Sequence, residues 1–443
     1  MRKWLDDRLR VQELLDSMFN HPAPKRSNFL DYLGFATLFA FINEAITGIL
    51  LATVYIPSAN EAYISVKAIE ASSAENFVRS LHAWGADFMI VLVVLHLLRV
   101  FYVGAYKYPR ELTWVSGVIL LLGTVALGFT GYLLPWDQEG YWATTVGTAM
   151  AGYVPFIGDY LIQVLRDGVN VTGATLTRFF AIHILVLPGI ILLSFLPHIF
   201  FVLRQGMTST DELTIAKQRG EDITQKSRPF YPNEAFRMAF FILINAVVLF
   251  ILADYFPKDL GEPADPLNME NYTPKPAWYF MGVYQLLKYF PGKLDVLAMV
   301  GLPLIGILIL FFLPWIDRNP SRSPKKRPVA LGVAAVLVIG LGVLTYQGMS
   351  SGPKVLETKG VVTHPSFQKD IEPIFQNYCL QCHPPYQSYS GILKEVTPGN
   401  PDKSLLYDSI TGKAKFPMPP GQPLSEDTIQ TINNWIQDGA KNN

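Results

Sequence analysis

Residues 79–99 read RSLHAWGADFMIVLVVLHLLR, an apolar segment with a histidine near each end. His82 and His96 are 14 residues apart, close to four turns of an α-helix and about 21 Å along its axis. The two imidazoles are therefore predicted to lie on nearly one face of a helix that is long enough to cross a bilayer. Polar side chains at that depth are costly and usually have a function.

A second apolar segment, near residues 176–203, carries His183 and His198, which are one position further apart than the first pair. Two facing helices with histidines at matched depths can hold two haem irons, one above the other. A single buried histidine would be explained equally well by a hydrogen bond between helices, but two matched pairs favour haem. Because both segments are expected to cross in the same direction, His82 pairs with His183 and His96 with His198.

Two further segments carry glycine pairs with the same period. Gly34 and Gly48 have the spacing of His82 and His96, and so do Gly117 and Gly131. A haem needs room beside the backbone, and glycine provides it because it has no side chain. Glycine is common in membrane helices, so one pair would indicate packing alone. Two pairs at the histidine spacing support the haem interpretation.

The composition of the whole chain is that of a membrane protein. Half of its 443 residues are hydrophobic and 16% are charged, which is too apolar for a soluble enzyme of this size. The formal net charge is zero, so no overall field favours nucleic acid. We predict an all-α integral membrane protein: a four-helix di-haem bundle, three further transmembrane helices and a small all-α C-terminal domain. The seven predicted spans lie near residues 33–56, 80–104, 113–134, 176–203, 236–254, 296–316 and 328–347.

The distribution of Lys and Arg predicts the orientation in the membrane. The N-terminal segment and every second connection after it carry twenty of these residues, and the other connections carry eight. Basic residues accumulate on the cytoplasmic side, so the N-terminus is expected in the cytoplasm of a bacterial cell. Seven crossings then place everything after about residue 348 outside the cytoplasmic membrane. Residues 1–24 lack the pattern of a removable signal peptide.

The polar C-terminal segment contains the attachment signature for a covalent c-type haem. Both cysteines of the chain lie in Cys379-Leu-Gln-Cys382-His383, in which the thiols bind the haem and His383 ligates its iron. The sixth ligand is predicted to be Met418, because a thioether raises the haem potential, and His364 is its competitor. Small bacterial class I cytochromes c are similar in the order of attachment site, methionine loop and final helix, which favours Met418.

Residues 5–325 resemble cytochrome b of the bc complexes, in particular the chloroplast and cyanobacterial type together with its separate small subunit. The 15-residue spacing of the second histidine pair also favours that branch. The resemblance rests on motifs along the whole region: Arg79-Ser-Leu-His82, His96-Leu-Leu-Arg99-Val, Pro109-Arg-Glu-Leu-Thr-Trp114, Gly131-Tyr-Leu-Leu-Pro-Trp-Asp-Gln138, Gly140-Tyr-Trp142, Leu176-Thr-Arg-Phe179 and Pro276-Ala-Trp-Tyr279.

This resemblance implies two non-covalent b haems, a quinol-oxidising pocket near the outer haem and a quinone-reducing pocket near the inner one, close to Arg204. The quinol pocket would be lined by Gly140, Tyr141, Trp142, Pro276, Ala277, Trp278 and Tyr279. Arg79 and Arg99 resemble the residues that meet haem propionates. An electron that crosses between the haems moves against the membrane potential, at a cost of about 2.3 kcal/mol per elementary charge for each 100 mV.

The resemblance also implies partners and a division into domains. A separate Rieske iron-sulfur protein would accept the second electron and pass it to the fused c haem, which feeds a soluble or membrane-bound acceptor. Membrane lipid, the quinone pool and a second copy of the chain are the other expected partners. The predicted domains are the di-haem domain at 1–228, a second membrane domain with the quinol pocket at 229–349 and the cytochrome c domain at 350–443.

Three positions depart from the family pattern. Ala277 stands where the quinol pocket usually has a glutamate that accepts a proton. Tyr32 stands where the chloroplast-type branch has a cysteine that attaches a further haem, so no covalent haem is expected there. Glu44 replaces an uncharged amide, one turn before Gly48, and we hypothesise that it partly replaces the missing proton acceptor. Its alternative role is a neutral carboxyl bonded to a neighbouring helix, and Asp87 is expected to make an interhelical contact.

Two other functions remain open on this sequence. The chain could be a haem membrane anchor that exchanges electrons between quinone and a different dehydrogenase or reductase. Ala277 supports this alternative, because the glutamate that usually accepts a proton is absent there. It could also be a structural or sensory haem protein without turnover. The presence of Trp278 and Tyr279 argues against the latter.

Overall fold

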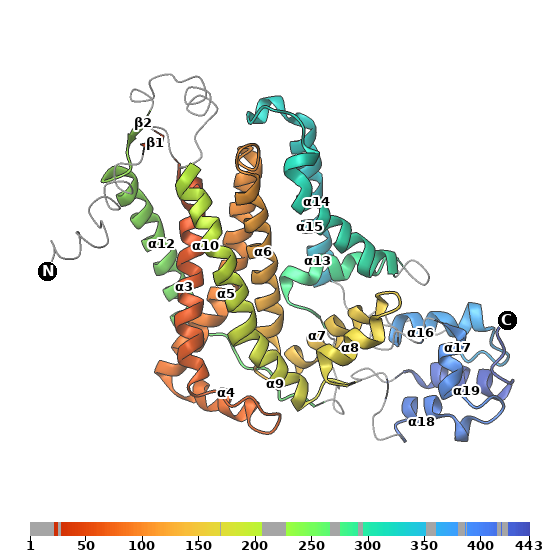
Figure 1. The fold of residues 1–443 in the computed structure, drawn as a ribbon. Coiled ribbons are helices and arrows are strands. Elements are labelled where there is room, and N and C mark those ends of the chain that lie inside the picture. Colours follow the sequence, from red (N-terminus) through yellow and green to blue (C-terminus); the bar gives the residue numbers. More distant parts are fainter. Residues whose placement is uncertain are drawn as a thin grey trace.

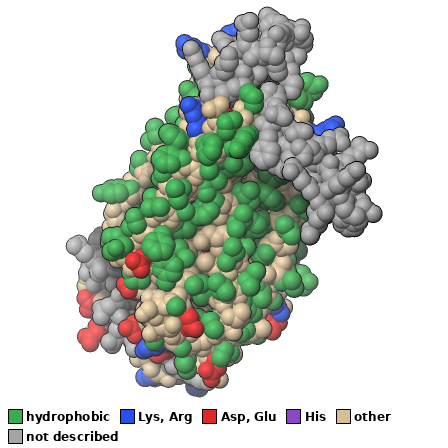
Figure 2. Space-filling model, turned by 90° about the vertical axis from the view of Figure 1, so that its left-hand side faces the viewer, with side chains coloured by type: hydrophobic (Ala, Val, Ile, Leu, Met, Phe, Trp, Pro, Cys, Tyr) green, Lys and Arg blue, Asp and Glu red, His purple; other side chains and the backbone are tan. Residues whose placement is uncertain are grey.

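The computed structural model describes residues 22–24, 28–168, 170–205, 227–265, 275–290, 296–350, 360–379, 386, 388–413, 418 and 424–443. Seven of its helical segments are long and apolar enough to cross a membrane, as the hydropathy predicts. Hydrophobic side chains cover the middle of the face shown in Figure 2, where lipid tails would meet them. The spanning segments are Phe29–Ala52 (η1 and α3), Ser73–Tyr102 (α5), Glu111–Tyr132 (α6), Gly173–Gln205 (α9, η3 and α10), Asn233–Tyr255 (α12), Leu297–Ile316 (η5 and α14) and Pro328–Ser350 (α15).

The helix ends differ from the predicted spans for physical reasons. The second helix begins at Ser73 rather than near residue 80, because its first turns are polar and hydropathy does not register them. The first helix ends at Ala52 rather than near residue 56. Pro57 disfavours the helical conformation at Ile56, so the helix does not extend to that residue.

The four N-terminal spans form a bundle in which α3 lies beside α5, and α6 beside α10 (Figure 1). The fifth span, α12, packs against α5. At the lower end of Figure 1 the connections carry short helices, and near the opposite end two strands, β1 and β2, pair antiparallel. The short elements are α4 (Ala62–Ala71), α7 (Gln138–Ala149), η2 (Met150–Tyr153), α8 (Gly158–Arg166), β1 (Pro22–Pro24) and β2 (Ser227–Pro229).

The second group of helices stands beside the bundle. Helix α13 (Trp278–Leu287) is too short to span a bilayer, and it packs against α15. This close packing requires small residues, because a Cβ on Gly282 would lie 2.5 Å from Leu341 and one on Gly348 would lie 2.6 Å from Met281. A short helix, η6 (Pro324–Lys326), connects α14 to α15.

A small helical unit with its own hydrophobic core occupies the C-terminal region. Phe375, Ile432 and Trp435 are almost fully buried in that core, so the segment has the interior that an independent domain needs. It lies at the same end of the molecule as α4, α7 and α8 (Figure 1). Its elements are η7 (Phe367–Ile371), α16 (Glu372–Tyr378), α17 (Tyr389–Ile392), η9 (Leu393–Glu395), η10 (Pro401–Lys403), α18 (Leu405–Ile410) and α19 (Glu426–Gln437).

Candidate functional site: two histidine pairs in the bundle

Each of the four membrane histidines lies against one of the four predicted glycines. His82 and His96 on α5 face α3, and His183 and His198 face α6. The glycines therefore leave room for the edge of an imidazole, whereas the sequence predicts only that they leave room for a haem. A Cβ added to the glycine would approach the Cε1 atom of its histidine as follows: Gly34 to His96 3.1 Å, Gly48 to His82 3.2 Å, Gly117 to His198 3.3 Å and Gly131 to His183 2.7 Å.

His82 and His183, called the outer pair after the side of the membrane on which the sequence places them, have the separation that one iron between two imidazoles requires. The ring centroids of His82 and His183 are 6.3 Å apart, with the ring planes 81° from parallel. Two metal–nitrogen bonds of about 2 Å, each extended by a ring radius of about 1.1 Å, span about 6.2 Å. The residues at this site thus fit a haem iron with two histidine ligands.

Hydroxyl groups fix the orientation of three of these imidazoles. In three cases the residue before the glycine is Ser or Thr, and its oxygen lies 3.0 or 3.1 Å from the Nδ1 atom of the histidine. Each hydroxyl donates its own proton to a carbonyl one turn earlier in its helix, so it accepts from Nδ1–H. The Nε2 lone pair is then free for a metal. The pairs are Thr47 with His82, Ser116 with His198 and Thr130 with His183.

These hydroxyls were missed by the sequence interpretation, although a signal was present. Thr47-Gly48, Ser116-Gly117 and Thr130-Gly131 share one dipeptide pattern at the haem spacing. The fourth glycine follows Leu33, which has no hydroxyl. Accordingly, the buried Nδ1 of His96 has no hydrogen-bond partner among the residues that the structure describes.

A π-helical segment reconciles the two histidine spacings. His183 lies in η3 (Ile182–Val186), which is π-helical, between α9 (Gly173–Ala181) and α10 (Leu187–Gln205). A π turn contains one more residue than an α turn. The longer step from His183 to His198 therefore covers about the same rotation and height as the step from His82 to His96 on α5.

Glu44 lies against the outer histidine pair. Its Oε2 atom is 3.2 Å from Nδ1 of His82, and its Oε1 atom accepts a hydrogen bond of 3.0 Å from the Asn43 amide. The carboxylate occupies the space beside Gly85 on α5, where a Cβ would lie 1.9 Å from Oε1. Glu44 is therefore held in place by contacts from two helices.

The two arginines predicted to meet propionates have protein partners in this structure. Arg79 forms an ion pair of 3.1 Å with Glu70, and Arg99 one of 2.6 Å with Asp31. Arg204 is exposed near the end of α10, 6.0 Å from the centre of the Phe200 ring. Tyr32 is buried and donates to Glu234 of α12. Binding of haem or quinone by the three arginines stays a prediction.

The predicted quinol-pocket segments lie beside the bundle. Trp278 donates a 2.7 Å hydrogen bond to Asp87 of α5, which confirms that Asp87 contacts another helix. The Tyr279 hydroxyl would be 2.8 Å from a Cβ on Gly128 of α6, one turn before Gly131. This places Tyr279 near the outer histidine pair. Pro276 and Ala277 immediately precede these two residues, and Ala277 is almost fully buried.

The other pocket segment, Gly140 to Trp142, lies in α7. Gly140 is required there, because a Cβ would lie 2.1 Å from the carbonyl oxygen of Tyr132. The buried rings of Tyr141 and Trp142 are in edge contact, and Trp142 donates to Gln138. Burial, with a smaller contribution from Glu139, raises the pKa of Asp137, which caps this helix by accepting from the backbone N–H of Gly140.

In the C-terminal unit the structure describes part of the predicted c-haem site. Cys379 packs against the core of the unit, and the backbone N–H of Met418 donates to Ser409, whereas Cys382 and His383 lie outside the described residues. His364 is 86% exposed and pairs with Asp438 at 3.0 Å, which makes it a poor candidate for an axial ligand.

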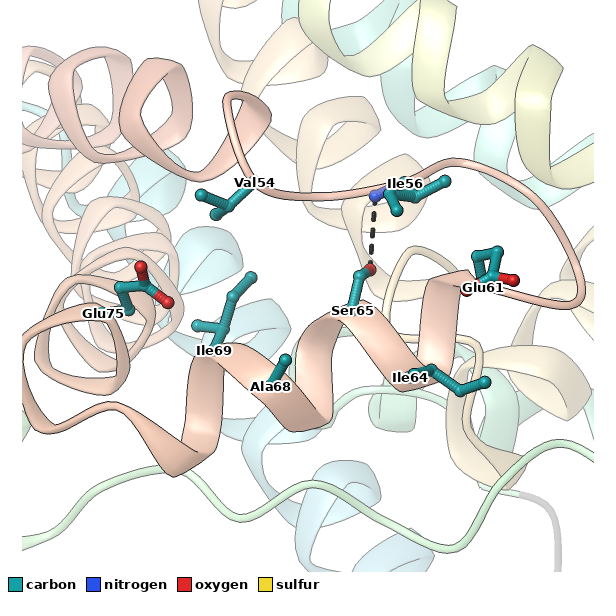
Figure 3. A pocket seen from close by; sticks show the side chains of 8 residues that line it. All are labelled: Val54, Ile56, Glu61, Ile64, Ser65, Ala68, Ile69 and Glu75. Carbon is teal, nitrogen blue, oxygen red and sulfur yellow. Dashed lines mark hydrogen bonds between the residues drawn. The ribbon is translucent and has the colours of Figure 1, made fainter.

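A small open hollow lies elsewhere, on α4 near the end of α3 (Figure 3). It is lined by apolar residues such as Val54, Ile56 and Ile69, and by Glu61 and Glu75 at its edges. None of the four membrane histidines and none of residues 276–279 line it. We assign no part of the redox site to this hollow.

Comparisons with known proteins match both membrane regions. The family model Cytochrome b/b6/petB matches residues 18–206, and Cytochrome b(C-terminal)/b6/petD matches residues 263–364. A cytochrome bc complex cytochrome b subunit from Chlorobaculum thiosulfatiphilum is 34% identical over 347 residues, which are 78% of this chain and 79% of that protein. Cytochrome b of Cereibacter sphaeroides is 32% identical, over 79% of this chain and 82% of the relative.

Two further comparisons agree. Cytochrome b6 of Picosynechococcus is 40% identical over 46% of this chain and 93% of its own length. The solved structure titled "Hyperthermophilic respiratory Complex III" has a TM-score of 0.72 and 27% identity, and it covers 80% of this chain and 92% of its own.

The fold and the histidine pairs define a multi-pass membrane protein for electron transfer, and the chain belongs to the cytochrome b family. It is the cytochrome b subunit of a bc-type electron-transfer complex, and its family implies b haems. The family predicted from the sequence motifs is thereby confirmed. The fused cytochrome c domain stays a prediction.

Proposed function

We propose that this chain oxidises quinol at a pocket beside the outer histidine pair, in a complex that couples electron transfer to proton translocation. One observation carries the proposal: Trp278 contacts α5 and Tyr279 approaches α6 within about one and a half turns of His82 and of Gly131, respectively. A quinol bound there would lie between the aromatic residues of α13 and the outer iron site. Gly140, Tyr141 and Trp142 complete the predicted lining.

Two carboxylates near this pocket could accept the proton that the quinol releases. Glu44 was the candidate from the sequence, and Asp87 is the one that contacts the Pro276–Tyr279 segment directly. Asp87 also pairs with Lys258 at 3.0 Å. Wild-type quinol oxidation in a Glu44→Gln variant would exclude Glu44 as the acceptor and leave Asp87.

His82 with His183, and His96 with His198, would hold two non-covalent b haems. When bound, these haems supply one-electron transfer between the two ends of the bundle. The residues of the chain orient the ligands through Thr47, Thr130 and Ser116, and they exclude water from the helix interior. Quinone reduction is assigned to the inner end near Arg204, and the N-terminus to the cytoplasmic side.

The second electron requires an acceptor outside this chain, and we assign that role to a Rieske iron-sulfur partner. It would deliver the electron to a covalent c haem held by Cys379, Cys382, His383 and Met418 in the outer domain, residues 350–443.

The di-haem domain (1–228) and the quinol-pocket domain (229–349) complete the chain, which is expected to act as a homodimer in a bacterial cytoplasmic membrane. Helices α7 and α8 and the C-terminal unit lie at the same end of the molecule, which supports electron transfer from the quinol pocket to the c haem.

The experiment is to mix the purified complex with reduced quinol and to record b-haem and c-haem reduction separately, with and without an inhibitor of the outer pocket. Reduction of both types, with the c haem blocked by the inhibitor, is the expected result. If only the b haems respond and no Rieske protein is present, the haem-anchor function replaces the proposal. This alternative is favoured by one observation: residue 277 is an alanine and provides no carboxylate to accept a proton.

A further inference from the structure

The pocket segment that has no carboxylate at Ala277 receives one from another helix. Trp278, the next residue, donates its indole N–H to Oδ1 of Asp87 on α5 at 2.7 Å. The other oxygen of that carboxylate, Oδ2, is 3.0 Å from Nζ of Lys258. Lys258 lies in the connection between α12 and α13, on the side that the charge distribution assigns to the outside of the membrane. Asp87 therefore joins the pocket segment to a cation of the outer connection.

The backbone around Lys258 is held against α5. The indole N–H of Trp84 donates to the carbonyl of Phe256 at 2.7 Å, and Arg79 donates to the carbonyl of Lys258 itself. An ion pair near a protein surface usually contributes little, partly because ordering two side chains costs entropy. This cost is reduced here, because the backbone that carries Lys258 is already fixed to the helix that carries its partner.

The ammonium group of Lys258 has a second contact besides Asp87. Nζ lies 3.7 Å from the centre of the Trp84 ring, and the face of an indole ring attracts a cation at that distance. The side chains of Lys258 and Asp87 are 37% and 25% exposed, so water can reach both. If Asp87 became neutral, the ammonium could remain on the Trp84 ring while water approached the carboxyl group.

We propose that Asp87 accepts the proton of the quinol in place of the glutamate absent at position 277, and that Lys258 is a positioning residue that keeps Asp87 ionised for this step. The O–H bond of the quinol breaks and an O–H bond forms on Asp87, while the electron pair of the broken bond stays on the quinol oxygen. Water on the Lys258 side then takes the proton outward. The inference rests on the proposed oxidation of quinol beside α13.

Two further titratable groups are within electrostatic reach of Asp87, namely Glu44 on α3 and Tyr279 on α13. Neither of them is a cation, and the ion pair of Asp87 among the described residues is the one with Lys258. A carboxylate that loses a neighbouring cation becomes protonated at a higher pH. Without Lys258, quinol oxidation should therefore decline at a higher pH than in the wild type.

The experiment measures the initial rate of quinol oxidation by the purified complex as a function of pH, with b-haem content determined on the same samples. Lys258→Met removes the charge and keeps most of the side chain. The acid limb of its pH profile should move upward by about one pH unit, which is a loss of about tenfold in rate on that limb. The b-haem content should not change. Lys258→Arg restores the cation and should return the profile toward that of the wild type.

Lys275→Met is the matched control, because Lys275 belongs to the same connection but donates to the carbonyl of Met349 and not to a carboxylate. Its pH profile should be that of the wild type. In a chain that already carries Asp87→Asn, adding Lys258→Met should have no further effect, because the two residues act through one contact.

An unshifted profile in Lys258→Met with wild-type b-haem content would overturn the inference, and so would an equal shift in Lys275→Met. These outcomes leave quinol oxidation itself intact. A wild-type complex that does not oxidise quinol would instead refute the proposed function, and the inference with it.

Discussion

At the scale of single residues, the histidine sites depend on four glycines, which have no side chain to occupy the space of an imidazole. Each of the four glycines leaves space for the edge of one imidazole, and the space is tightest at Gly131, where a Cβ would lie 2.7 Å from Cε1 of His183. A ring that bound iron on one side and Thr130 on the other could not shift to admit a methyl group. The glycine is therefore part of the site.

Gly131→Ala should remove the outer haem and leave the inner one, so that the b-haem content falls by about half. Gly306→Ala on α14 is the control, since nothing lies within 4 Å of the added Cβ. Pyridine haemochrome spectra of purified membranes measure the ratio of haem to protein. Full haem content in Gly131→Ala would contradict the contact described above.

Asp87→Asn tests the carboxylate that contacts Trp278. The asparagine oxygen can still accept the indole N–H, so the packing of α13 is preserved while the proton acceptor is lost. Quinol oxidation should slow by about 100-fold or more, with both b haems retained. A rate equal to that of the wild type would show that Asp87 has only a structural role.

At the scale of helices, the sequence is sufficient for the seven spans and the histidine pairing, because both follow from periodicity and hydropathy. It is insufficient for contacts between distant segments. The bond from Trp278 to Asp87 joins residues 191 positions apart, and no local pattern predicts it. The π-helical turn at His183 was also not predicted, because the longer spacing of the second histidine pair was interpreted only as a family trait.

That turn predicts which deletions the helices tolerate. Removing Val186 makes the step from His183 to His198 equal to the step from His82 to His96 and converts the π turn to a regular one, so both haems should remain. Removing Val93 from α5 rotates His96 by about 100° relative to His82 and should cost one haem. The b-haem content of the two deletion variants should therefore be compared. Equal losses in both would contradict the role of the π turn.

At the scale of the whole molecule, an ionic cluster joins the bundle to the C-terminal spans. Asp317, after α14, pairs with Lys107 at 2.8 Å and accepts from Tyr106, and Arg327 lies 3.8 Å away. Burial alone would raise the pKa of Asp317, but the hydrogen bonds from Lys107 and Tyr106 hold it below the ordinary value. The ionised carboxylate therefore stabilises the folded state.

Asp317→Asn should lower the free energy of unfolding by about 3 kcal/mol, since it leaves buried cations without their partner. Because the pKa is depressed in the folded protein, this contribution is complete above the ordinary pKa of aspartate and disappears as the pH falls through the lower, folded value. Denaturant titrations from pH 7 downward should show a constant difference from the wild type that closes only in strong acid. A difference that closed near neutral pH would be inconsistent with the cluster.

The proposed composition of the complex can be tested by stoichiometry. Two b haems and one c haem per chain, with a Rieske protein in the same preparation, are expected. Cys382→Ser should leave at most the thioether to Cys379 and lower the c-haem content, while the b haems stay in full amount, because the C-terminal unit has its own core. Loss of the b haems in that variant would mean that the two regions do not fold separately.

The hydroxyl contacts also bear on how the protein is assembled. Thr47 and Thr130 hold the outer imidazoles in one tautomer and one direction before any cofactor arrives, so little side-chain entropy is lost when haem enters. His96 has no such anchor among the described residues, and its ring must be ordered by the incoming haem itself. We therefore expect biogenesis to proceed in sequence, with the outer haem inserted first and the inner haem completing the subunit.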